Sequence, residues 1–138
     1  MPDNIMAMQR LTSIYLEMDN PQAALETLEE TQKHSPRDPN VYYNIGAVYA
    51  NIGNDALSKG QDIYREVVKM DPIDREQLGI ALESFKQAQS AYSEALYFMD
   101  NTLALSPDDD AAAQALREIQ RTKKILDTMQ RSAEQILR

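Results

Sequence analysis

The stretch "NVYYNIGAVYANIGN", residues 40–54, decides the class of fold. Its large apolar side chains recur at spacings of three, four and three residues: Tyr42, Ile45, Tyr49 and Ile52. This spacing is typical of one face of an α-helix. Two glycines, Gly46 and Gly53, lie within the same stretch, although each should cost about 1 kcal/mol relative to alanine inside a helix. A helix that keeps both glycines needs a structural reason for each.

The composition indicates a folded protein that neither binds nucleic acid nor inserts into a membrane. Of 138 residues, 43% are hydrophobic and 26% are charged, as in ordinary globular domains. The net charge of −8 is opposite to the basic surface that phosphate backbones attract. No apolar run approaches the roughly 20 residues that cross a bilayer. The absence of cysteine excludes disulfides and leaves the compartment open.

Four prolines divide the chain into units of similar length. Pro2, Pro36, Pro72 and Pro107 are separated by 34, 36 and 35 residues. Aromatic residues follow the first three prolines in the same phase: Tyr15, Tyr49 and Phe85. Small residues precede the last three in the same phase: Ala24, Gly60 and Ala95. A regular period of this length indicates stacked structural repeats.

Each unit is predicted to form two antiparallel helices. The turns are expected at Asn20-Pro21, at Gly53-Asn54-Asp55 and near Ser90. Asparagine followed by proline is a helix start signal, and glycine at the end of a helix is a stop signal. No strand-like alternation competes with this pattern, so we expect an all-α chain.

The motifs resemble those of the tetratricopeptide repeat (TPR) family. Tyr42-x2-Ile45-Gly46-x2-Tyr49 is similar to the motif of the first helix in a repeat, and Ala95-x3-Met99 to that of the second. The resemblance covers residues 2–107. It implies a right-handed α-α superhelix of three TPR-like helix pairs (about 3–36, 37–72 and 73–107) plus a long capping helix, 108–138. In such a domain of residues 1–138, Gly46 would be a helix contact and Gly53 a helix stop.

The phase of the first proline bears on the extent of the protein. Pro2-Asp3 lies where a repeat boundary is expected, so we expect residues 1–138 to be the C-terminal part of a longer protein. The predicted location is cytoplasmic if residue 1 is the natural start, and periplasmic or another compartment if the chain is a fragment.

Nothing in the sequence predicts an enzyme, a cofactor site or a metal site. The single histidine, His34, and the lack of cysteine leave too few ligands for zinc. Asp108-Asp109-Asp110 lacks the spacing of a calcium loop and is expected to cap the last helix. The glycines match no phosphate-binding loop.

The resemblance to the TPR family predicts a protein or peptide partner in a concave groove lined by the first helix of each repeat. The residues expected there are Arg10, Ser13, Tyr43, Asn44, Ala47, Asn51, Ile80 and Glu83. Tyr43 offers a large contact area, and the amides of Asn44 and Asn51 can bind a peptide backbone. The chaperone-tail-binding branch of the family uses Lys, Asn, Asn, Lys and Arg. Here Gln9, Ser13, Asn44, Glu76 and Ile80 stand at those positions, so that ligand is not expected.

The last helix carries a second apolar pattern beyond the residues that should cap the third repeat. Its members recur at three-four spacing: Leu126, Met129, Ala133 and Ile136. This pattern allows a homodimer seam or a contact with a partner, which would make the chain a structural or oligomerisation module. It also allows simple packing within a monomer. The scaffold function is the first prediction and the oligomerisation module is the alternative.

Overall fold

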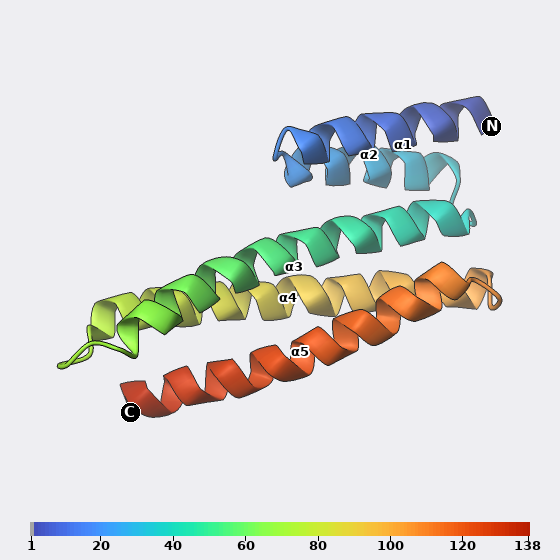
Figure 1. The fold of residues 1–138 in the computed structure, drawn as a ribbon. Coiled ribbons are helices and arrows are strands. Elements are labelled where there is room, and N and C mark those ends of the chain that lie inside the picture. Colours follow the sequence, from blue (N-terminus) through green and yellow to red (C-terminus); the bar gives the residue numbers. More distant parts are fainter. Residues whose placement is uncertain (1) are drawn as a thin grey trace.

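The chain forms five helices joined by short loops (Figure 1). The computed structural model describes the backbone of residues 2–138 and the side chains from residue 6 onward, so residue 1 of the predicted domain lies outside it. The helices are α1 (Pro2–Glu17), α2 (Pro21–His34), α3 (Pro39–Val67), α4 (Arg75–Leu105) and α5 (Asp110–Leu137). No strand occurs between residues 2 and 138. The predicted all-α class is confirmed.

Short polar side chains begin four of the helices. Asn20, Asp38, Asp74 and Asp109 each accept a hydrogen bond from a backbone N–H in the first turn that follows. Such a bond satisfies a donor that has no partner inside the helix. The expected caps at Asn20-Pro21 and within the aspartate triplet are therefore confirmed, with Asp109 accepting from the Ala112 N–H at 3.0 Å.

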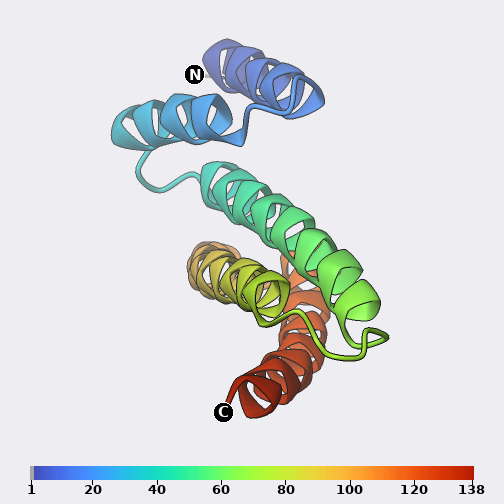
Figure 2. The same ribbon diagram turned by 90° about the vertical axis from the view of Figure 1, so that its left-hand side faces the viewer.

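The helices stack in order along the molecule, and α1 and α5 are the outermost elements on opposite sides (Figures 1 and 2). The hairpin of α1 and α2 covers only the N-terminal half of α3. Helices α3 and α4 form a long antiparallel hairpin, and α5 runs back along α4. One core cluster lies among α3, α4 and α5, and a second lies between α2 and α3.

Two of the predicted turns do not exist. Gly53 lies inside α3 and Ser90 inside α4, and both helices continue through these positions. Only the first repeat forms a helix pair, and the second and third each form a single long helix. The prediction of three helix pairs was wrong in this respect, because α3 and α4 bury their apolar faces against each other along most of their lengths.

The hairpin of α3 and α4 has a seven-residue register. Three glycines of α3 face three large side chains of α4: Gly46 faces Met99, Gly53 faces Tyr92 and Gly60 faces Phe85. A Cβ atom on these glycines would lie 3.0, 2.7 and 2.6 Å from the facing side chains. A period of seven keeps one seam of each helix toward its partner, as in a coiled coil. Gly46 is a helix contact as predicted, whereas Gly53 is a contact and not a stop.

Candidate interaction site

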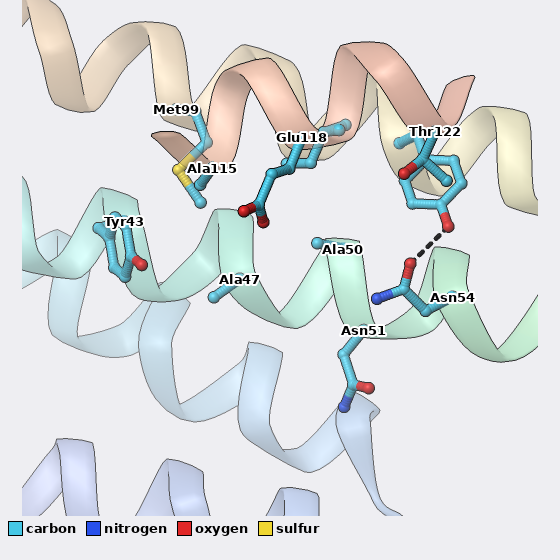
Figure 3. Close-up of a pocket in the computed structure, with 11 residues that line it drawn as sticks. Tyr43, Ala47, Ala50, Asn51, Asn54, Met99, Ala115, Glu118 and Thr122 are labelled. Atoms are coloured by element: carbon cyan, nitrogen blue, oxygen red, sulfur yellow. Dashed lines mark hydrogen bonds between the residues drawn. The ribbon is translucent and has the colours of Figure 1, made fainter. Parts of the chain in front are cut away.

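A cavity of about 260 Å³ opens where α3 and α5 diverge over α4 (Figure 3). Its residues come from all three helices: Tyr43, Ala47, Ala50, Asn51, Asn54, Tyr92, Met99, Ala115, Glu118, Ile119 and Thr122. The cavity exists because three alanines stand where α3 faces α5, and a methyl group cannot fill the space between two diverging helices. Met99 and Tyr92 of α4 close its floor with apolar surface.

One carboxylate projects into this cavity. The side chain of Glu118 reaches from α5 toward α3, between Tyr43 and Ala50 (Figure 3). It accepts a hydrogen bond of 3.3 Å from Gln114 Nε2, on the same helix. No cation pairs with Glu118 among the residues whose side chains are described. An exposed acceptor over a partly apolar wall favours a ligand that combines an apolar group with a hydrogen-bond donor or a positive charge.

The far end of the cavity is fixed by a bond between helices. Tyr92 Oη donates to Asn54 Oδ1 at 2.5 Å, which joins α4 to α3. Burial raises the pKa of the Tyr92 hydroxyl to about 12. The hydroxyl therefore stays protonated at neutral pH and keeps donating this hydrogen bond.

Three of the predicted groove residues line this cavity together: Tyr43, Ala47 and Asn51. The Asn51 side chain turns away from α5 and lies at the rim (Figure 3). Asn44, predicted beside them, is half-buried and does not line the cavity.

The other predicted groove residues lie elsewhere. Arg10 and Ser13 border a shallow depression on α1. Glu83 borders a third hollow, next to Tyr49 and Ile52 of α3. Ile80 is 44% exposed and borders none of these three cavities. Within the described part of the chain the predicted groove residues therefore do not all border one hollow, because α3 and α4 are continuous helices and do not place the first halves of the repeats side by side.

The apolar pattern of the last helix packs within the chain. Leu126 and Ala133 are 0% exposed, and the half-buried Met129 and Ile136 contact the same core cluster. Gln61 Nε2 of α3 also donates to Met129 Sδ at 3.6 Å. These contacts agree with packing inside one chain, the second interpretation of the pattern. A dimer seam through Leu126 would require α5 to separate from α4, because Leu126 is already buried in the core.

Several residues of the cavity were not predicted from the sequence: Ala50, Asn54, Ala115, Glu118 and Thr122. Their signal was the spacing of small residues on α3 together with a second face of α5. The predicted helix stop at Gly53 placed Asn54 in a turn, so Asn54 could not be grouped with Ala47 and Ala50 on one helix face.

The described residues offer neither a metal site nor a membrane-spanning helix. No group of acidic or histidine side chains within residues 6–138 could hold a metal ion. No helix in the described part of the chain is long and apolar enough to span a bilayer.

The fold and the cavity define an all-α protein of stacked antiparallel helices with a hollow between α3 and α5. No family model matches the chain. The chain is similar to protein O-mannosyl-transferase TMTC1 of Homo sapiens, with 26% identity over 121 residues, which cover 84% of this chain and 13% of that protein. The Mus musculus counterpart is also 26% identical over 121 residues, and 12% of it is covered. The chain thus spans only a small part of these relatives. Among solved structures, the MamA RS-1 ArsTM double mutant matches 96% of both chains with 17% identity and a TM-score of 0.33.

Proposed function

We propose that the chain is a protein-interaction scaffold that holds a segment of a partner protein in the cavity between α3 and α5. One observation carries this proposal: Tyr43, Ala47 and Asn51, expected at a binding surface from the repeat motif, border the same cavity. Concave surfaces on helical repeats commonly bind other proteins. An aromatic side chain beside a hollow is also a common centre of a protein interface.

The chemistry of the cavity suggests the character of the partner segment. The methyl groups of Ala47, Ala50 and Ala115 leave room for one apolar side chain. The Glu118 carboxylate beside them favours a lysine, an arginine or a backbone N–H in the ligand. It would repel a carboxylate. A neutral or basic segment with an apolar anchor therefore fits better than an acidic tail.

The site offers little for catalysis. Its polar groups are hydroxyls, amides and one carboxylate, and the cavity lining includes no nucleophile with an adjacent base. His34 lies at the end of α2, beside Glu30. The mannosyl-transferase activity in the name of the similar proteins belongs to chains of which this one covers only 13% and 12%. A binding function is therefore the better proposal.

The proposal can be tested by filling the cavity with a larger side chain and measuring peptide binding. Peptides that bind the wild-type chain would be selected from a random library, and their affinities compared with Ala47→Leu. Leucine at this half-buried position would occupy the space between α3 and α5. The matched control is Ala104→Leu, an exposed alanine of α4. We expect affinity to fall about tenfold or more for Ala47→Leu, a loss of about 1.4 kcal/mol, and to be unchanged for the control.

A second variant checks the role of charge. Glu118→Gln keeps the shape of the side chain and removes its charge, so binding of basic peptides should weaken while that of neutral peptides persists. If the selected peptides bound Ala47→Leu as well as the wild type, the cavity would not be their site and the proposal would fail.

A further inference from the structure

The outer face of α5 carries a line of basic side chains, called here the basic stripe. Positions 117, 121, 124, 128, 131, 135 and 138 recur at alternating spacings of four and three and are all exposed. Five of the seven are basic: Arg117, Arg121, Lys124, Arg131 and Arg138. The other two are Thr128 and Gln135, so the line contains no acidic residue. At 1.5 Å per residue the basic stripe extends for roughly 32 Å.

The basic stripe stands out against the rest of the chain. Residues 110–138 contain six Lys or Arg and four Asp or Glu, whereas residues 1–109 contain eight and eighteen. The stripe also lies opposite the side of α5 that buries Ile119 and Leu126 against α4. Packing inside the chain therefore does not account for the choice of basic residues at these positions.

Contacts within the chain do not explain them either. The ion pairs among the described side chains involve α2 and the end of α3, and none includes a residue of α5. Two acidic groups of α5 have other partners, since Asp127 accepts from Gln89 of α4 and Glu134 accepts from Gln130. Arg117 and Arg121, one turn apart, repel each other and cost a few tenths of a kcal/mol in an isolated helix.

We propose that the basic stripe docks an acidic helix of a partner protein. Arginine binds carboxylates through two parallel hydrogen bonds, and a helix with acidic residues at three-four spacing presents them at the same period. Ile125, which is 56% exposed and one turn beyond Arg121, adds an apolar contact beside the charges. Such a combination of apolar and polar surface is usual in protein interfaces.

The surroundings favour a narrow acidic helix over other polyanions. A nucleic acid or an anionic bilayer presents a broad surface, which would also approach the acidic remainder of the molecule. Charges are felt over about 8–10 Å at physiological salt, so this approach would be repelled. A second copy of the same stripe would be repelled as well. None of the basic side chains of the stripe lines the cavity between α3 and α5.

The experiment measures binding of a fluorescent acidic peptide of about 20 residues, the length that matches the stripe. Its glutamates lie at three-four spacing and one leucine stands at its centre. The test variant is Arg121→Glu with Lys124→Glu and Arg131→Glu. The control reverses three exposed cations elsewhere, Arg37→Glu with Lys59→Glu and Lys86→Glu, and so has the same net charge. Circular dichroism verifies that both variants stay folded.

We expect the wild type to bind the acidic peptide, with an affinity that falls as salt rises. The stripe variant should lose about tenfold or more, a change of about 1.4 kcal/mol, and the control much less. Equal losses in both variants would show that net charge alone matters and would overturn the proposal. No binding by the wild type would also overturn it. So would tighter binding of phosphatidylserine vesicles or duplex DNA than of the peptide.

Discussion

Gly53 of α3 lies against the ring of Tyr92 of α4 so closely that a Cβ atom on Gly53 would come within 2.7 Å of the ring. Real Cβ contacts are essentially never this short. The same tyrosine donates its hydroxyl proton to Asn54, the next residue of α3. Gly53 and Asn54 thus hold one side chain between them. The pair fixes the middle of the long hairpin, at the point where a turn had been predicted.

Replacing Gly53 by alanine should destabilise the protein. Alanine gains about 1 kcal/mol of helix propensity, but its methyl group must displace a ring packed in the core, and overpacking costs about 1–3 kcal/mol. Since the gain offsets part of this cost, we expect a net loss of up to about 2 kcal/mol in the free energy of unfolding, measured with urea.

Gly79→Ala is the matched control, because a Cβ atom on Gly79 in α4 meets nothing within 4 Å. This variant should be more stable than the wild type by up to about 1 kcal/mol. Stabilisation of equal size by both substitutions would contradict the close contact at Gly53.

The contact between Gly53 and Tyr92 should also appear as an energetic coupling. In a Tyr92→Ala background the ring is absent, so the methyl group of Gly53→Ala meets free space. We expect the destabilisation by Gly53→Ala to disappear there, with a coupling of about 1–3 kcal/mol in the double-mutant cycle. Additive effects would indicate that the two residues do not touch.

Ionisation of Tyr92 should make stability fall at high pH. Its pKa in the folded protein is about 12, against 10.0 for the free side chain. Between these values only the unfolded chain loses the proton, so unfolding becomes more favourable as pH rises from 10 toward 12. Below pH 10 the contribution is constant.

Tyr92→Phe tests this assignment. It removes the hydroxyl and its hydrogen bond, with an expected cost of about 1 kcal/mol at pH 7. It should also make the decline of unfolding free energy between pH 10 and pH 12 less steep than in the wild type. Identical slopes, measured by urea unfolding across this range, would mean that Tyr92 is not the buried group responsible.

The sequence predicted correctly which segments are helical, but it predicted the breaks between helices only in part. Periodicity and the prolines reveal which segments are helical, since these signals are local. Asn20-Pro21 is a true break, because proline and an N-cap act on the backbone directly. Gly53-Asn54-Asp55 has the composition of a turn, yet α3 continues through it. Whether a glycine ends a helix or packs inside it depends on the helix that faces it. The register of Gly46, Gly53 and Gly60 against α4 is set by tertiary packing, which local sequence signals do not contain.

The candidate site shows the same division. Tyr43, Ala47 and Asn51 share one face of one helix, so local spacing suffices to group them. Arg10 and Glu83 were grouped with them on the assumption that three helix pairs stack into a superhelix. The long hairpin of α3 and α4 arranges the helices differently, so Arg10 and Glu83 border other hollows. Glu118 was missed since its position opposite Ala47 depends on how α5 returns along α4.

A proline at Asp55 distinguishes the continuous helix from a turn. In the interior of α3, proline removes a hydrogen bond and clashes with the preceding turn, which costs about 3 kcal/mol or more. A turn at residues 53–55 would tolerate it. We therefore expect Asp55→Pro to unfold the chain or to lower its melting temperature sharply.

The control for Asp55→Pro is Gln22→Pro, in the first turn of α2, where a backbone N–H has no partner within the helix. It should have a small effect. A similarly small effect of Asp55→Pro would favour the bent, helix-pair form of the second repeat.

Two neighbouring residues of α5 decide between internal packing and a dimer seam. Leu126 is 0% exposed and Ile125 is 56% exposed. Leu126→Ala should cost about 2–5 kcal/mol of stability, because it empties space in the core among α3, α4 and α5. Ile125→Ala should change stability by no more than about 0.5 kcal/mol. Light scattering on a sizing column would give the mass of each variant across a tenfold range of concentration. Internal packing requires that Leu126→Ala lower the melting temperature without changing the mass of the folded protein. A wild-type dimer that Leu126→Ala converts into a stable folded monomer would contradict this packing and restore the dimer seam.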